Sequence, residues 1–224
     1  MRKQFTDALI AFILGDAAPS SELKRRLETE EGQRELKAYR ETLQALETHY
    51  REAQVSKRPE PIYYTKMTAP IGDLFVAATN KGLVRISFMS NESGFVSELR
   101  TRLNRDVVES IEKVSGVAEQ LHEYFAGKRS KFSVAIDWSL VTPFQRRVLE
   151  AAIAVPAGHV TSYGELARRI GQPGASRAVG NALGRNPVPI VIPCHRIVRE
   201  GGGLGGYTGG LDIKKKLLQI EGAL

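Results

Sequence analysis

The sequence predicts an α+β protein: a small antiparallel-sheet domain is followed by a helical domain containing a helix-turn-helix, and an extra helical segment precedes both. Three changes of pattern lead to this prediction. Apolar residues recur every three or four positions before residue 56, every second position from residue 62, and again at helical spacing after residue 141. We therefore divide the chain into a helical extension over 1–56, an α+β domain over 62–138 and a helix-turn-helix domain over 141–224.

The extension is expected to consist of helices. A short apolar helix is predicted over residues 5–14, and Asp7 within it argues against a signal peptide. Residues 21–53 are predicted to form one amphipathic helix, because their apolar side chains fall at three- and four-residue spacing: Leu36, Tyr39, Leu43, Leu46 and Tyr50. The stretch KRPEP, residues 57–61, is too rich in proline to continue a helix and is expected to be a linker.

The second domain is expected to begin with three strands. The runs IYYTKM, DLFVAAT and LVRISF are rich in β-forming residues, and the turns TAPIG and NKG separate them, which predicts an antiparallel meander. Residues 93–105 and 115–126 have helical spacing. The stretch KFSVAIDW, residues 131–138, is predicted to return as a strand.

The region after residue 141 is expected to be helical. In TPFQRRVLEAAIAV, Thr142 and Pro143 are typical of the cap and the first position of a helix. The stretches SYGELARRIG and ASRAVGNALGR follow with only the turn QPGA between them, which is the outline of a helix-turn-helix. Many pairs of short helices share this outline. A last helix is predicted in LDIKKKLLQIEGAL.

Composition narrows the class of protein. One cysteine makes no internal disulfide and no cysteine cluster for zinc, which excludes a disulfide-stapled secreted scaffold and favours the cytoplasm or the nucleus. No stretch approaches the ~18 apolar residues that a membrane span needs. The net charge is +7, and residues 141–224 carry 11 basic and 5 acidic groups. This excess indicates either a polyanionic partner such as nucleic acid or an ordinary solvated surface.

The only cysteine, Cys194, lies in VPIVIPCHRIV and is open to two interpretations. A lone cysteine is most often a small buried apolar residue. Three prolines before it and His195 and Arg196 after it suit instead a rigid segment that aims a reactive thiol. The glycine-rich residues 200–210 form either a plain hairpin loop or a backbone that approaches a ligand closely. Glu221 is either solvated or turned back to orient the imidazole.

A family resemblance rests on PCHRIV, preceded by GRNPVPIVI and followed by GGYTGGL. This pattern resembles the active-site signature of the methylated-DNA protein-cysteine methyltransferases, the O6-alkylguanine-DNA alkyltransferases. The similarity extends over TPFQRRVLEAA, VTSYGELA and GASRAVGNAL, and more loosely over TAPIGDLFVAATNKGLVRISF. It covers residues 62–224, and it implies a ribonuclease-H-like fold for residues 62–138.

The resemblance implies a DNA repair protein with methylated-DNA protein-cysteine S-methyltransferase activity. Such a protein binds duplex DNA through a helix-turn-helix in the minor groove, flips out O6-alkylguanine, with O4-alkylthymine as a further candidate, and transfers the alkyl group irreversibly to its own cysteine. It needs no cofactor and, in this chain, no metal, because the zinc ligands of some members include cysteines that are absent here. A monomer in the cytoplasm, associated with the nucleoid in a prokaryote, is expected.

Residue roles follow from the same resemblance. Cys194 is the nucleophile, His195 a base that acts through a water, and Glu221 the group that holds its ring. The resemblance also places Asn186 and Tyr163 in the catalytic group: Asn186 braces the active-site segment, and Tyr163 donates a hydrogen bond to the guanine. The expected DNA and substrate contacts include an arginine finger, Arg177, and a loop that closes over the base; the full set is Arg177, Ala178, Arg196, Val198, Gly205, Tyr207, Thr208 and Gly209.

Other hypotheses remain open. One is a sensor or transcriptional regulator that binds alkylated DNA with little transfer activity, which the extension would suit. Another is a thiol hydrolase that uses Cys194, His195 and Glu221 on a small substrate, although it leaves the basic last third unexplained. Residues 5–46 loosely resemble the small helical anti-sigma-factor domains, without their zinc ligands. A helical arm that binds a protein partner or a second copy is the alternative for this segment.

Overall fold

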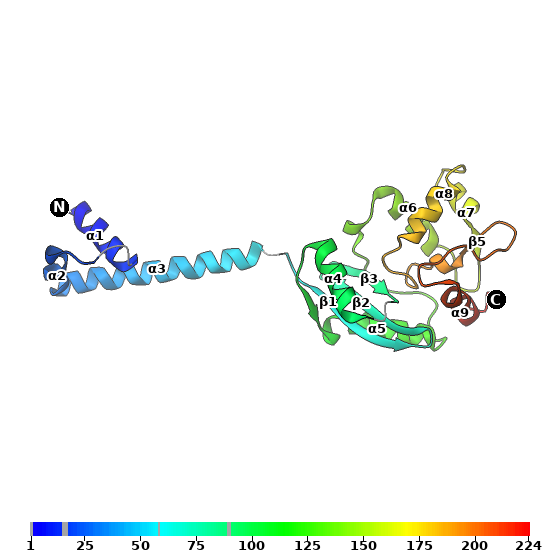
Figure 1. Cartoon of the computed structure of the whole chain (residues 1–224), viewed down its shortest axis with the longest axis horizontal. Coiled ribbons are helices and arrows are strands. Elements are labelled where there is room, and N and C mark those ends of the chain that lie inside the picture. Colours follow the sequence, from blue (N-terminus) through cyan, green and yellow to red (C-terminus); the bar gives the residue numbers. More distant parts are fainter. Residues whose placement is uncertain (1, 15–17, 58, 89–90) are drawn as a thin grey trace. The chain divides into compact units, whose positions relative to one another are not determined.

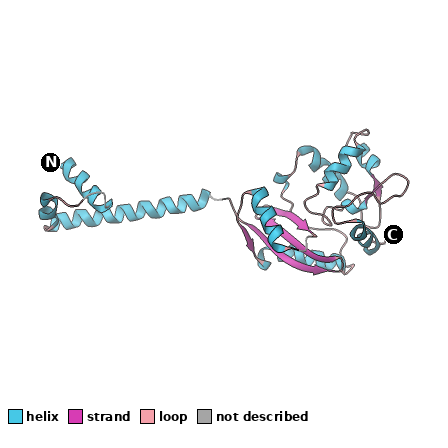
Figure 2. Ribbon diagram, viewed as in Figure 1, coloured by secondary structure: helices cyan, strands magenta, loops and turns pink. Residues whose placement is uncertain are grey.

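The computed structural model describes residues 2–14, 18–57, 59–88 and 91–224, and residue 58 of the predicted linker lies outside them (Figures 1 and 2). Contacts divide the chain into two compact units, Met1–Pro59 and Glu60–Leu224. No helix in the described ranges is long and apolar enough to cross a membrane.

The first unit contains α1 (Arg2–Leu14), α2 (Ser21–Leu27) and α3 (Glu30–Lys57) around a small core of Leu9, Leu23 and Leu36. The prediction of one helix over residues 21–53 is wrong, because the chain turns between α2 and α3. Thr29 starts α3 by accepting a hydrogen bond from Gly32 N at 3.1 Å. A Cβ on Gly32 would lie 2.0 Å from the Arg26 carbonyl oxygen, so the corner requires glycine.

The second unit is built on a sheet whose first three strands form the predicted antiparallel meander. These are β1 (Ile62–Ala69), β2 (Gly72–Thr79) and β3 (Gly82–Ser87), and the register pairs Thr65 with Val76 and Val76 with Ile86. A short strand, β4 (Val107–Glu109), joins β1 in parallel and makes the order β3-β2-β1-β4. The sequence analysis missed β4, because three residues are too few to show a period.

The two faces of the sheet are covered by α4 (Glu92–Leu103) and α5 (Ile111–Phe125). Alternate residues of β2 point to opposite faces. Phe75 stacks on Phe95 of α4 with ring centroids 5.0 Å apart, and its neighbour Leu74 belongs to the cluster that contains Leu121 of α5. The α5 face is therefore the one that continues into the rest of the core.

The predicted strand over residues 131–138 is wrong. Only an isolated bridge forms, between Leu83 and Ile136. The reason lies in Asp137, whose carboxylate accepts hydrogen bonds from Ser139 N at 3.0 Å and from the Thr79 hydroxyl at 3.0 Å. These bonds turn the chain into the 3₁₀ helix η1 (Trp138–Leu140) before a ladder can extend.

The remaining helices are α6 (Pro143–Ile153), α7 (Tyr163–Arg169), α8 (Ser176–Gly184) and α9 (Leu211–Ile220). The predicted cap on α6 is confirmed, since Thr142 Oγ1 accepts a hydrogen bond from Gln145 N at 3.2 Å. As predicted, α7 and α8 are two short helices that pack on each other across a brief turn. The strands β5 (Thr161–Ser162) and β6 (Ile197–Val198) pair in parallel beside them.

One hydrophobic core runs through the second unit, from the α5 face of the sheet to α6, α7, α8 and α9. A backbone hydrogen bond of 2.9 Å from Ile86 N in β3 to the Pro187 carbonyl also ties the sheet to the segment before Cys194. The sheet therefore supports the segment that carries the single thiol.

Candidate active site

A strained turn aims Cys194. Val188 O accepts a hydrogen bond from Ile192 N at 3.0 Å, and the fully buried Ile190 between them has φ +75°. A positive φ is unfavourable for a β-branched residue and persists only where the surroundings enforce it. The chain then enters the 3₁₀ helix η2 (Cys194–Arg196). The three prolines before the cysteine and the packing around Ile190 both restrict the backbone of this segment.

The thiol of Cys194 is buried, with 6% of the residue exposed. Asn186 Nδ2 donates to Sγ at 3.2 Å and to the Ile192 carbonyl at 2.9 Å, while Asn186 Oδ1 accepts from Val188 N at 3.0 Å. Burial raises the pKa of the thiol to about 11, although the Asn186 hydrogen bond and the charge of Lys214 act in the opposite direction. At neutral pH the resting group is a thiol, so reaction with an electrophile requires a base.

His195 is fully buried and its Nε2 lies 2.9 Å from Glu221 Oε1. Burial lowers the pKa of His195, more than the Glu221 carboxylate raises it, so the ring is neutral at pH 7. A carboxylate only accepts hydrogen bonds, hence Nε2 carries the ring proton and Nδ1 is the basic nitrogen. Nδ1 is buried without a hydrogen-bond partner in the described part of the chain.

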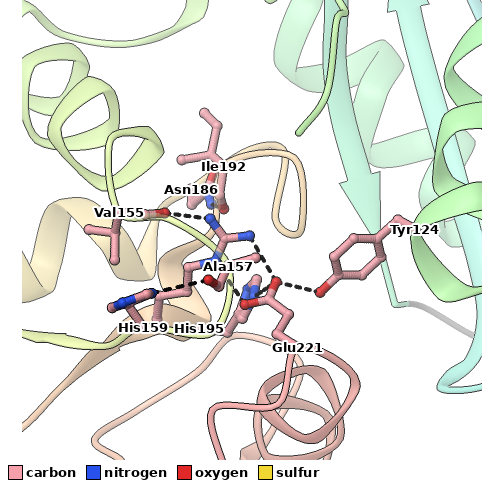
Figure 3. A network of polar contacts seen from close by, with 9 residues as sticks. Tyr124, Val155, Ala157, His159, Asn186, Ile192, His195 and Glu221 are labelled. Atoms are coloured by element: carbon pink, nitrogen blue, oxygen red, sulfur yellow. Dashed lines mark hydrogen bonds and ion pairs between the residues drawn. The ribbon is translucent and has the colours of Figure 1, made fainter. Parts of the chain in front are cut away.

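Glu221, at the end of α9, collects donors from two other elements (Figure 3). Arg196 binds both carboxylate oxygens, with Nε 2.9 Å from Oε2 and Nη2 2.8 Å from Oε1, and the Tyr124 hydroxyl donates to Oε1 at 2.7 Å. Burial by itself raises the pKa of this carboxyl, but the bonds from His195, Arg196 and Tyr124 outweigh it and lower the pKa to about 2. Glu221 is therefore ionised across the physiological range.

The resemblance predicts that Arg196 contacts DNA or substrate, but in the structure its side chain binds other groups of the protein. Only 4% of the residue is exposed, and its guanidinium is occupied by Glu221 and by the Val155 carbonyl. In this position the side chain neutralises the carboxylate rather than facing solvent.

A cavity of about 640 Å³ opens beside the thiol. Five residues singled out in the sequence line it together: Tyr163, Arg177, Cys194, Tyr207 and Thr208. Tyr163 begins α7, Arg177 is exposed on α8, and the last two belong to the glycine-rich loop before α9. Burial, followed by the nearby Cys194 sulfur, raises the pKa of Tyr163, so its phenol stays protonated.

The glycine-rich loop approaches a side chain of the protein. Gly205 has φ +70°, and a Cβ there would lie 2.7 Å from the Tyr163 hydroxyl oxygen. Gly209 packs against the Phe88 ring, and Thr208 Oγ1 donates to the Gly184 carbonyl at 3.2 Å. The loop is therefore more than a plain hairpin, because its glycines allow the backbone to lie against Tyr163 and Phe88.

Five of the eight residues expected to contact DNA or substrate do not line the cavity: Ala178, Arg196, Val198, Gly205 and Gly209. Ala178 is exposed on α8 and Val198 is half-buried in β6, and neither is among the described residues that line the cavity. No group of three or more His, Cys, Asp or Glu side chains suited to a metal ion occurs within the described ranges.

Sequence reasoning missed two residues of this site, Lys214 and Tyr124. Lys214 is fully buried, and its Nζ donates to the Ile197 carbonyl at 2.6 Å and to the Leu204 carbonyl. A signal for it existed, because Lys214 shares the core-facing phase of α9 with Leu217 and Leu218. For Tyr124 there was none, since its position on the apolar face of α5 indicates only a core residue.

Comparison with known proteins shows two matching family models. The model described as "6-O-methylguanine DNA methyltransferase, ribonuclease-like domain" matches residues 62–138, and "6-O-methylguanine DNA methyltransferase, DNA binding domain" matches residues 143–223.

Individual relatives agree with these models. The chain is 39% identical to a methylated-DNA–protein-cysteine methyltransferase of Methanosarcina acetivorans, over 72% of this chain and 99% of that one. The crystal structure of Mycobacterium tuberculosis O6-methylguanine methyltransferase superposes with a TM-score of 0.62 at 37% identity, over 72% of this chain and 93% of that one. The M. tuberculosis protein in complex with DNA gives 0.61 at 37%, over 71% and 92%.

The Glu221 network predicts a specific loss of stability in acid. Its carboxyl has a pKa of about 2 in the folded chain against 4.5 as the ordinary value. A lowered pKa contributes stability above pH 4.5, and that contribution, roughly 3 kcal/mol, disappears as the pH falls towards 2. Urea unfolding between pH 2 and 6 should therefore show a wild-type advantage over Glu221→Gln that shrinks with acid. Equal pH slopes for the two proteins would contradict the ionised carboxylate.

Proposed function

Because the chain belongs to the 6-O-methylguanine DNA methyltransferase family, we propose that it repairs duplex DNA by transferring the alkyl group of O6-alkylguanine to its own Cys194. The proposal is based on the surroundings of this single thiol. Cys194 lines a cavity with Tyr163 and Arg177, and the neighbouring His195 is paired with the buried Glu221. Each molecule acts once, because the thioether that forms has no route back to a thiol.

In the proposed reaction the thiol proton leaves before or as the sulfur attacks the alkyl carbon. His195 takes it through Nδ1, by way of a water, since Glu221 already occupies Nε2. The sulfur–carbon bond forms while the bond from carbon to guanine O6 breaks, and the electron pair goes to the guanine. Tyr163, protonated because burial raises its pKa, supplies a hydrogen bond that stabilises the departing guanine anion.

DNA contact is assigned to α7 and α8. The O6 atom of a stacked guanine is out of reach of a buried thiol, so the base has to leave the helix and enter the cavity. Arg177 is exposed on α8 and is one of the residues that line the cavity. Its side chain suits the role of filling the gap that the flipped base leaves in the stack. The excess of basic groups in residues 141–224 supports attraction to the phosphate backbone.

We assign residues 62–138 to the supporting domain and 141–224 to binding and transfer.

Two further assignments complete the proposal. The protein acts as a monomer in the cytoplasm, in contact with the nucleoid if its source is a prokaryote. The helical extension, residues 1–56, binds a protein partner, and the support for this is that it lies in a compact unit of its own, Met1–Pro59, outside the residues that the family models match.

Alkyl transfer is tested by the intact mass of the protein after incubation with a duplex that carries one O6-methylguanine. The wild type should gain the mass of one methylene, since a methyl group replaces the thiol hydrogen, and Cys194→Ala should gain nothing while still binding the duplex. Tight binding of the lesion without a mass change in the wild type would favour the sensor hypothesis. Repeated turnover of a small substrate would favour the thiol hydrolase.

The finger role of Arg177 is tested by comparing two substrates. Arg177→Ala should slow transfer from the duplex roughly tenfold and leave reaction with free O6-benzylguanine nearly unchanged, because only the duplex has a gap to fill. Arg185→Ala is the matched control, since it removes an exposed charge just past α8 from a residue outside the cavity lining. Equal losses on both substrates would argue against a finger.

Sedimentation tests the monomer state, and truncation tests whether alkyl transfer needs the extension. The full chain should sediment at its monomer mass of 24.7 kDa. A chain that begins at residue 60 contains the whole second compact unit and should keep its transfer rate within about twofold. A stable dimer would contradict the monomer, and loss of transfer on truncation would place the extension in the reaction.

A further inference from the structure

Tyr124 reaches the catalytic carboxylate from the supporting domain. It belongs to α5, is 97 positions away from Glu221 in the sequence, and is 1% exposed. Its hydroxyl oxygen lies 2.7 Å from Glu221 Oε1 (Figure 3). Burial, and then the negative charge of Glu221, raise the pKa of this phenol. Tyr124 is therefore the donor and Glu221 the acceptor at every working pH.

Tyr124 donates to the same carboxylate oxygen as His195, which is Glu221 Oε1. Glu221 Oε1 accepts from His195 Nε2 at 2.9 Å and from Arg196 Nη2 at 2.8 Å in addition to the phenol. Oε2 accepts only Arg196 Nε among the hydrogen bonds of the described residues, at 2.9 Å. Three donors bind one oxygen, so each hydrogen bond reduces the negative charge that this oxygen presents to the other two donors.

We propose that Tyr124 is a positioning residue for alkyl transfer: from α5 it fixes Glu221 Oε1 against His195 and limits the negative charge that this oxygen presents to the imidazole. The inference rests on the proposed function, since it assigns His195 as the base. It gives residues 62–138 a part in the chemistry, although Cys194, His195 and Glu221 all lie outside them.

Removal of the phenol hydroxyl has an effect of known sign. Without it, Glu221 Oε1 presents more of its charge to His195 Nε2 and stabilises the imidazolium, which raises the pKa of His195. The other charged or titratable groups around the pair are unchanged: Arg196 on Glu221, and Lys214, Cys194 and Tyr207 nearby. The transfer rate falls when the base is protonated, so a higher pKa of His195 shifts the acidic limb of the pH–rate profile to higher pH.

A matched control exists elsewhere in the fold. The Tyr64 hydroxyl donates to Glu92 Oε1 at 2.7 Å, the same distance as in the Tyr124 pair. Tyr64 is also buried, but it lies in the cluster beneath α4, on the opposite face of the sheet. Tyr64→Phe therefore removes a tyrosine–carboxylate bond of the same length, to the exposed Glu92, without touching the site.

The test is single-turnover methyl transfer by the full chain from a saturating duplex with one O6-methylguanine, measured between pH 5 and 9. In Tyr124→Phe the midpoint of the acidic limb should rise by about one pH unit, the shift expected for loss of one hydrogen bond to a charged group. Tyr64→Phe should keep the wild-type midpoint. Phe retains the ring that packs against Phe125 and Phe132, so the fold is expected to survive.

A second variant and a second measurement keep the test decisive. Replacement of Tyr124 by 4-aminophenylalanine retains a donor and should restore the midpoint most of the way to wild type. Titration of His195 by NMR in the Cys194→Ala background should show the same rise in pKa when Tyr124→Phe is added. An unchanged His195 pKa, or equal shifts in the two phenylalanine variants, overturns the role of Tyr124. Absence of any transfer in the wild type overturns the proposed function instead.

Discussion

A buried carboxylate at the end of a helix is the constraint on which the site depends. Glu221 caps α9, where the partial negative charge of the helix terminus already disfavours a second negative charge. Burying an unpaired carboxylate costs several kcal/mol, so this residue is tolerable only when surrounded by donors. Arg196 and His195 approach it from η2 and Tyr124 from α5. Satisfying one charge thereby fixes three side chains from two segments of the chain.

The same burial sets the chemistry of the thiol. Removed from water, Cys194 has a raised pKa and stays protonated, so it is a poor nucleophile until a base takes its proton. We propose the neutral imidazole of His195 as that base, because Glu221 holds the proton on Nε2 and leaves Nδ1 free of it. The resting thiol of this single-use nucleophile is thus protonated, with only 6% of the residue exposed.

The backbone around the cavity is held by packing against the sheet and the loop. Ile190 keeps its positive φ because its side chain is buried and the Pro187 carbonyl is tied to β3. On the other side, Gly205 and Gly209 lie against the rings of Tyr163 and Phe88. Contacts from Ile86, Phe88 and Tyr124 therefore tie the segments around the thiol to the sheet domain.

The sequence by itself determined the α+β class, the meander, the capped α6 and the paired helices α7 and α8, because period, turn residues and caps are local properties. Its resemblance to a family also singled out Cys194, His195 and Glu221. Only the tertiary structure decided the corner at Gly32, the lost strand after residue 130 and the burial of Arg196. It alone joined Tyr124 to Glu221, since a hydrogen bond across 97 positions depends on how the helices pack, and no local pattern encodes it.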